Sequence, residues 1–247
     1  MSRPIQSIWF ILGCLALFCS CDQAIQDKGF LKYYYPLDEL KEGLVYEYHP
    51  VNTDSLPIDY WYYRVHEVNG EEYLTANNYN SDFEVQQFVR EKVAWEGVQL
   101  VDFILYRRNP DGTQEQIDVD IQKNEVFPSY TLDSTKQYTM KLKWDLPKEE
   151  GTFLTLEREK KFYAKSEYPY DGNNVECVVF ELKEHIEHFI EDDGYLEPEY
   201  PGIEIYAKGI GLVYFKKVLG EGVEMEYKLV KTYSMEEFEK LYDKSLN

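Results

Sequence analysis

Of the four histidines in the sequence, only His185 and His188 lie near each other. On a helix, residues three positions apart share a face, so both imidazoles could bind one metal ion together with a nearby carboxylate. On a strand, the same spacing sends the two side chains to opposite faces, and no shared site forms. The apolar residues around the pair fit both periods, and the segment 184–193 is acidic enough to be an ordinary solvated surface. We expect no metal site here.

Catalytic motifs are equally sparse in the sequence. It contains neither the Gly-x-Ser-x-Gly elbow of serine hydrolases nor the His-Glu-x-x-His motif of metalloproteases. Neighbouring acids such as Glu149–Glu150 and Asp192–Asp193 are expected by chance in a chain with 46 acidic residues. We assign no catalytic residue and no cofactor, and we expect a protein that is not an enzyme. An envelope or polymer hydrolase, with His and carboxylate groups converging in one cleft, stays the alternative.

Cys21 is the residue for which the sequence predicts a covalent modification. Arg3 precedes an apolar run, residues 8–18, which ends at Cys19-Ser20-Cys21-Asp22. A positive start, roughly ten apolar residues and a small residue before the cleavage point are typical of an export signal. The run is shorter than the ~18–20 residues that would span a bilayer. We therefore expect residues 1–20 to be removed after export.

Residues 18–21, Phe-Cys-Ser-Cys, resemble the lipobox of bacterial lipoproteins, in which a small residue precedes the cysteine that receives a diacylglyceryl group. The resemblance implies lipid on Cys21 and attachment to the cell envelope, most simply the outer membrane of a Gram-negative bacterium. Phe18 departs from the usual aliphatic first position. Residues 11–14, Ile-Leu-Gly-Cys, fit the motif better but leave a short apolar run, so Cys14 is kept as an alternative, as is an export signal without lipid. Two or three acyl chains suffice for lasting attachment.

The charge of the chain limits its partners. Cleavage after residue 20 removes Arg3 and no acid, so the formal net charge of −20 becomes −21. Such a field repels phosphate backbones and anionic head groups, which excludes nucleic acid as a partner and leaves the lipid as the link to the membrane. Cys177 is the only cysteine outside the targeting segment and reads as a small buried residue of a strand rather than a nucleophile.

The rest of the sequence is typical of antiparallel strands. Aromatic residues make up 16% of the chain, and aromatic residues favour strands. Asn69-Gly70 joins the runs 60–68 and 71–76, the two-residue spacing of a type I′ hairpin. Further hairpins are predicted between 99–106 and 116–121 and between 212–218 and 223–230, with extended runs at 83–93, 138–144, 153–163 and 175–182.

Helical signals are confined to two places. Ser234 and Glu237 form a capping box before apolar residues at helical spacing, which predicts a short C-terminal helix. A single helical turn is possible at residues 37–40. Residues 1–20 are thus a signal peptide and 21–31 a tether without periodicity, while 32–247 form one β domain whose apolar side we expect the last helix to cover in part.

Two motifs resemble those of uncharacterised Gram-negative envelope lipoproteins. Residues 35–48 contain a proline-leucine step, a glycine and an aromatic first strand, and residues 206–214 place Gly209 and Gly211 on either side of an aliphatic residue. The resemblance implies a mainly β fold: a strongly bent antiparallel sheet or incomplete barrel, similar to the LolA/LolB lipoprotein carriers, with a short C-terminal helix. From the residues alone, such glycines indicate a bend, a bulge or a close backbone approach rather than a ligand-cradling loop.

The aromatic strand 60–63 bears on what the protein binds. Trp61 and Tyr63 share one face and Tyr60 and Tyr62 the other, so one pair is expected in the core and the other at the surface. A bent sheet with an aromatic concave face could hold an apolar ligand such as a lipid, a glycan, or a partner envelope protein. We therefore predict a non-enzymatic binding or interaction module.

Overall fold

The computed structural model describes residues 29–51, 53, 55–128, 134–147, 151–190, 194–220 and 222–245. The predicted signal peptide, Cys14 and Cys21 lie outside the described residues, as does the tether as far as residue 28. Their processing therefore stays a prediction.

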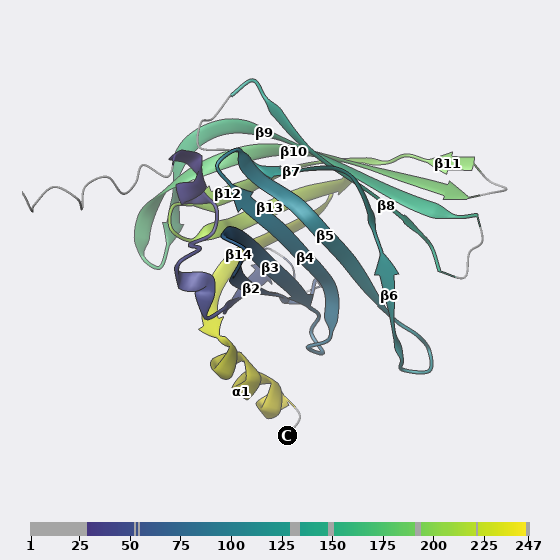
Figure 1. Cartoon of the computed structure of the whole chain (residues 1–247), viewed down its shortest axis with the longest axis horizontal. Helices are drawn as coiled ribbons and strands as arrows, with labels where there is room; N and C mark the ends of the chain where they lie inside the picture. The colour runs from purple at the N-terminus through teal and green to yellow at the C-terminus, as the bar shows by residue number, and fades with distance from the viewer. Residues whose placement is uncertain are drawn as a thin grey trace, which may run out of the picture.

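Twelve strands form a closed antiparallel barrel (Figure 1). In order around the ring they are β10 (Asn173–Ile190), β12 (Glu199–Ala207), β13 (Gly211–Gly220), β14 (Val223–Ser234), β1 (Leu44–Pro50), β2 (Asp59–Val68), β3 (Glu71–Tyr79), β4 (Val85–Ala94), β5 (Gly97–Arg108), β7 (Asp120–Phe127), β8 (Gln137–Asp145) and β9 (Phe153–Tyr170). Pairing of β9 with β10 closes the ring. The short strands β6 (Gln114–Asp118) and β11 (Gly194–Leu196) extend it by pairing with β5 and β10. The predicted mainly β fold is confirmed, and the bend of the sheet continues to closure.

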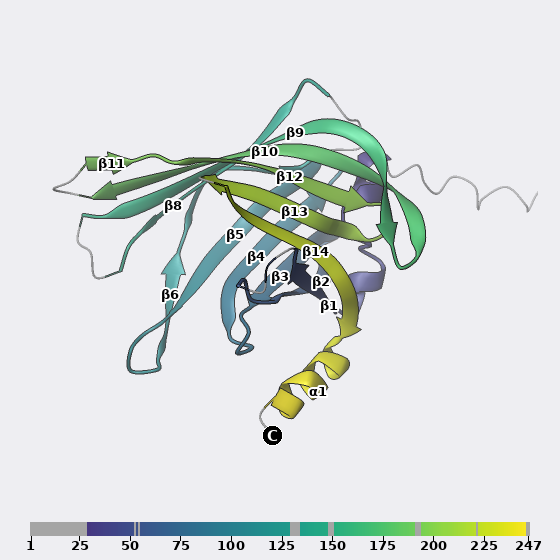
Figure 2. The ribbon, with the colours of Figure 1, turned by 180° about the vertical axis from the view of Figure 1, so that it is seen from behind.

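The predicted hairpins are present. Asn69 and Gly70 have φ of 55° and 80°, as a type I′ turn requires, and β2 pairs with β3 from Tyr60 to Val68. Gly112 supplies the positive φ of the β5–β6 turn. The predicted strand 116–121 is divided, because β6 pairs with β5 whereas β7 continues toward β8. Figure 2 shows β6 leaving the barrel wall together with the end of β5.

The C-terminal helix α1 (Met235–Ser245) begins at the predicted capping box. The Ser234 amide donates to Glu237 Oε2 at 2.9 Å, and the Glu237 amide donates to Ser234 Oγ at 3.3 Å. Phe238 packs on Tyr60 and Phe83 in a small cluster outside the barrel, separate from the main core. The expectation that the helix covers the main apolar side was therefore wrong. That side faces inward and is enclosed by barrel closure.

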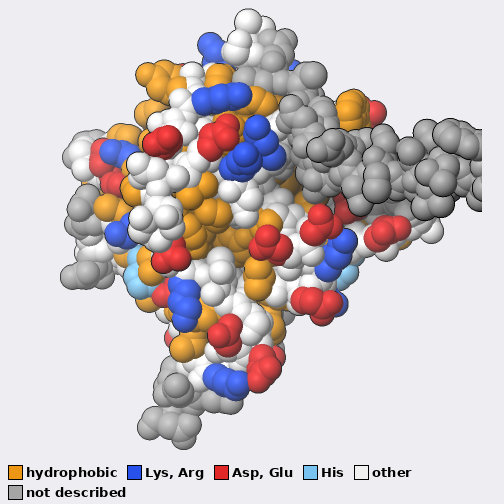
Figure 3. All heavy atoms as spheres, turned by 90° about the vertical axis from the view of Figure 1, so that its left-hand side faces the viewer, with side chains coloured by type: hydrophobic (Ala, Val, Ile, Leu, Met, Phe, Trp, Pro, Cys, Tyr) orange, Lys and Arg blue, Asp and Glu red, His pale blue; other side chains and the backbone are white. Residues whose placement is uncertain are grey.

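The N-terminal segment closes one end of the barrel. It contains two 3-10 turns, η1 (Gly29–Tyr33) and η2 (Glu39–Lys41), shown in purple in Figure 1. Phe30, which the sequence places in the tether 21–31, packs edge-on against Phe162 in the core. We call residues 29–43 the plug. Figure 3 looks onto this end of the molecule, where apolar side chains gather between acidic and basic ones.

The two resembling motifs meet at the plug. Gly209 lies in the turn between β12 and β13, and its amide donates to the Lys32 carbonyl at 3.0 Å. Tyr46, from the opening motif, donates to the Ile210 carbonyl at 2.9 Å. Gly211 has a φ of +99°, and a Cβ at this position would lie 2.5 Å from Cδ1 of Tyr35. The closing glycine is thus required both by its backbone conformation and by close approach of the plug.

Gly211→Ala and Gly209→Ala form a matched test of this packing. Both glycines have positive φ, at +99° and +72°, which costs an L-residue roughly 1–2 kcal/mol. Only Gly211 also faces Tyr35, since a Cβ at Gly209 has no heavy atom within 4 Å. Denaturant melts should show that Gly211→Ala lowers the free energy of unfolding by about 1–3 kcal/mol more than Gly209→Ala. Equal losses would contradict the close approach.

Candidate functional site

The barrel encloses a cavity of about 480 Å³. Tyr34 and Tyr35 of the plug bound it at one end, and Asp59, Gln87 and Met225, near the starts of their strands, line it toward the other. This volume lies within the roughly 300–1,000 Å³ typical of small-molecule sites. The cavity is therefore the candidate site.

One wall of the cavity is aromatic and aliphatic. Trp61 and Tyr63 line it from β2, with ring planes 14° apart, and Phe215 and Tyr227 form a second stacked pair. The expectation that one pair lies in the core and the other at the surface was wrong. Tyr63 on the inner face and Tyr60 on the outer face are both buried, because Phe238 of α1 covers Tyr60, and Trp61 and Tyr62 are both half-buried.

Charged side chains also line the cavity, from β9, β12 and β13, and Glu204 among them is the cross-strand partner of Phe215. Strand alternation places Arg158 and Lys160 of β9 on the same face as the apolar Leu156 and Phe162. Lys217 of β13 and Glu204 of β12 also line the cavity. We call Arg158, Lys160, Glu184, Glu204 and Lys217 the charged cluster.

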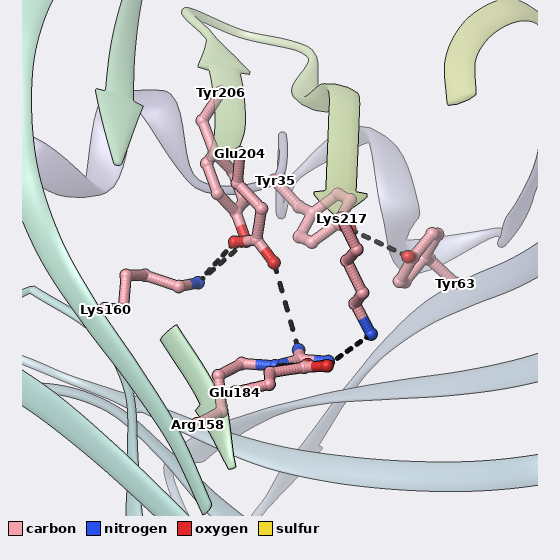
Figure 4. Close-up of polar contacts among 8 residues, drawn as sticks. All are labelled: Tyr35, Tyr63, Arg158, Lys160, Glu184, Glu204, Tyr206 and Lys217. Atoms are coloured by element: carbon pink, nitrogen blue, oxygen red, sulfur yellow. Dashed lines mark hydrogen bonds and ion pairs between the residues drawn. The ribbon is translucent and has the colours of Figure 1, made fainter. Parts of the chain in front are cut away.

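Two carboxylates organise the charged cluster (Figure 4). Glu184 Oε1 accepts from Arg158 Nε at 2.6 Å, and Glu184 Oε2 lies 2.7 Å from Lys217 Nζ. Glu204 Oε2 lies 2.7 Å from Lys160 Nζ and accepts from the Tyr206 hydroxyl at 2.8 Å. Arg158 Nη1 is 3.8 Å from Glu204 Oε1, beyond hydrogen-bond distance. The two carboxylates therefore hold three cations on one wall.

These contacts shift the titration of the cluster. Burial opposes ionisation of Glu184, but Arg158 and Lys217 overcome it and lower its pKa to about 2. Glu204 is also buried, and Lys160 and Arg158 lower its pKa. Burial lowers the pKa of Lys217, and the nearby Arg158 lowers it further. Both carboxylates are thus anionic at neutral pH.

Two tyrosines of the plug also reach into the cavity. Tyr34 donates to the Glu91 carboxylate, whose pKa burial raises. Tyr35 donates to the Tyr63 hydroxyl at 2.7 Å and packs against its ring. Each hydroxyl thereby has a partner in a buried setting, which avoids the cost of an unpaired polar group.

Another carboxylate, that of Asp59, lies near the end of the cavity away from the plug. It accepts from Trp61 Nε1 at 2.8 Å and from Asn78 Nδ2 at 2.5 Å, and burial raises its pKa. The contact fixes the Trp61 indole against the cavity wall.

The sequence candidates do not converge on this cavity. His185 and His188 lie on β10, where alternation places them on opposite faces, as the strand interpretation requires. Among the described residues, no group of three or more His, Cys, Asp or Glu side chains could hold a metal ion. Cys177 is 1% exposed within the core, as predicted for a small buried residue.

Sequence reasoning missed the charged cluster. The available signal was the phase of the strand, meaning which alternate residues face inward. In β9, Arg158 and Lys160 stand at alternate positions between Leu156 and Phe162, so all four side chains share one face. Charged residues in phase with a buried face indicate either ion pairing or a lined cavity.

Solved structures with a similar fold include a proposed lipoprotein from Parabacteroides distasonis. It is 14% identical to this chain with a TM-score of 0.51, and the match covers 84% of this chain and 100% of that one. A proposed exported protein with a YmcC-like fold from Bacteroides fragilis is 12% identical (83% and 99% covered, TM-score 0.49). The hypothetical lipoprotein YmcC from Escherichia coli is 13% identical (78% and 88% covered, TM-score 0.33). At this identity the first match shows a shared fold alone.

Sequence comparisons add no family. No protein-family model matches the chain, and no curated protein matches its sequence. Within the described ranges, none of the helices is long and apolar enough to cross a membrane.

Proposed function

We propose that this protein is a lipid-anchored component of a bacterial cell envelope that binds a small amphipathic molecule inside its barrel. The observation that carries the proposal is the cavity, whose lining combines aromatic side chains with a charged cluster. A ligand with an apolar body and a polar group matches both. The proposed role is binding rather than catalysis.

Two further observations support the envelope location. The sequence places a lipobox-like motif at Cys21, and the fold is similar to that of a Parabacteroides distasonis protein described as a proposed lipoprotein. The resemblance to the LolA/LolB carriers, which carry lipoproteins, suggests a ligand with a lipid chain. In support of a non-enzymatic role, none of the four histidines lines the cavity in the described part of the chain.

Lipidation is tested at Cys21. In a Gram-negative host, the full chain should incorporate a palmitate analogue and partition into detergent, because the Cys21 thiol is the predicted acceptor of the diacylglyceryl group. Cys21→Ala should lose both properties, whereas Cys14→Ala should keep them. Label that persists in Cys21→Ala and disappears in Cys14→Ala would move the site to Cys14. A native chain that takes up no label would contradict the lipid anchor.

Occupancy of the cavity is tested with the neutral probe N-phenyl-1-naphthylamine. The mature chain, residues 21–247, made without its signal peptide so that Cys21 carries no lipid, should enhance probe fluorescence by burying it. Ala76 of β3 is 5% exposed and lines the cavity, so Ala76→Phe should weaken probe binding about tenfold or more by filling that space.

Thr75→Phe is the control. Thr75 precedes Ala76 in β3 and faces the other side of the strand, so this substitution adds the same ring to the outer face. Val89 pairs with Ala76 and also lines the cavity, so Val89→Phe repeats the test if Ala76→Phe does not fold. Equal probe binding by the native chain and the folded cavity-filling variants would contradict the proposal.

A further inference from the structure

The charged cluster contains one more cation than anion. Arg158, Lys160 and Lys217 face Glu184 and Glu204, so within the cluster there are three cations for two directly contacting carboxylates. A buried charge without compensation is costly, and a ligand of opposite charge removes that cost.

The surplus can be located within the cluster. Lys160 is enclosed, with its ammonium 2.7 Å from Glu204 and 4.9 Å from the Tyr206 ring centroid. Arg158 directs Nε and Nη2 to Glu184, while Nη1 reaches no carboxylate within hydrogen-bond distance. Lys217 has three donors and pairs with Glu184. Free donor capacity therefore lies on Arg158 and Lys217.

Both residues present that capacity to the cavity. Their side chains are 29% and 20% exposed, although they point into the barrel, and both line the cavity. Their exposed atoms therefore face the enclosed space. Glu184, 3% exposed, holds the guanidinium and the ammonium side by side from beneath.

The other acids that line the cavity are paired elsewhere. Glu91 accepts from Tyr34, Asp59 accepts from Trp61 and Asn78, and Glu125 pairs with Lys136 at 2.5 Å. Each of these carboxylates thus has its own hydrogen-bond or ion-pair donor, and none of them makes a direct contact with Arg158 or Lys217, although Glu91 is close enough to Arg158 and Lys160 to interact with them electrostatically.

We propose that Arg158 and Lys217 form a head-group site that binds the anionic group, carboxylate or phosphate, of a single-chain amphiphile. The inference rests on the proposed binding function and specifies its ligand class. The anion would accept from Arg158 Nη1 and Lys217 Nζ, while the chain lies against Trp61, Phe103 and Met225 on the apolar wall. Charge-assisted hydrogen bonds of this kind are stronger than neutral ones, so the head group decides selectivity.

The test compares ligands that share a chain and differ in the head group. Laurate, monododecyl phosphate, dodecanol and dodecylamine are titrated against the mature chain near neutral pH by displacement of N-phenyl-1-naphthylamine. Laurate or the phosphate should bind about tenfold or more tightly than dodecanol, and dodecylamine should bind most weakly. The better of the two anions identifies the head group.

Lys217→Gln is the first variant, because Glu184 keeps Arg158 as a partner and the fold is preserved. It should weaken the anionic ligand about tenfold and leave dodecanol unchanged. Lys216→Gln is the control: Lys216 is the adjacent residue of β13, and it pairs with Glu224 rather than lining the cavity. Arg158→Gln should act like Lys217→Gln, with dodecanol binding reporting whether it folds.

Two results would overturn parts of the account separately. If all four ligands bind equally, or Lys217→Gln and Lys216→Gln behave alike, the head-group site is wrong while the binding cavity stands. If none of the ligands displaces the probe and the probe itself does not bind, the proposed function fails as well.

Discussion

The width of a twelve-strand barrel is the constraint on which the rest of this structure depends. About eight strands enclose a space that inward side chains just fill, and barrels of about 16 strands hold open channels. Twelve strands lie between these limits, so the inner face here cannot complete its own core. Large tyrosines and the plug occupy one end, where Tyr34 is 1% exposed, and the remaining space is the cavity. The hollow is a consequence of strand number rather than a local defect in packing.

The charged wall follows from the same geometry. Ion pairs buried in a filled core often contribute little net stability, because loss of hydration offsets their attraction. Glu184 and Glu204 nevertheless hold Arg158, Lys160 and Lys217 on one side of the barrel with direct contacts. A wall that keeps cations oriented toward an enclosed space is better explained by recognition of a charged ligand than by stability. The Tyr34–Glu91 and Tyr35–Tyr63 hydrogen bonds connect the plug directly to residues that line the cavity.

Local signals in the sequence predicted much of the fold. Asn69-Gly70 and the capping box at Ser234 act over a few residues, and both occur as expected. The ring depends on the pairing of β14 with β1, strands from the two ends of the domain, which no short motif encodes. The β9–β10 pairing is a local hairpin at Asp171-Gly172, where both residues have positive φ, and it was not predicted from the sequence. The charged cluster was missed because it combines side chains of four strands. Arg158 and Glu184 face each other across the β9–β10 hairpin, whereas Glu204 and Lys217 come from β12 and β13. Phase could have marked Arg158 as inward, but these further partners depend on the register of other strand pairs.

The central claim is that the barrel interior is a binding site whose charged wall orients the ligand. Anomalous diffraction from crystals of the mature chain grown with 12-bromododecanoate tests it most directly, because bromine marks the chain end and the carboxylate marks the head. The account predicts bromine inside the barrel against the apolar wall lined by Trp61, with the carboxylate at hydrogen-bond distance from Arg158 and Lys217. Bromine found only on the outer surface, with the cavity unchanged, would contradict it.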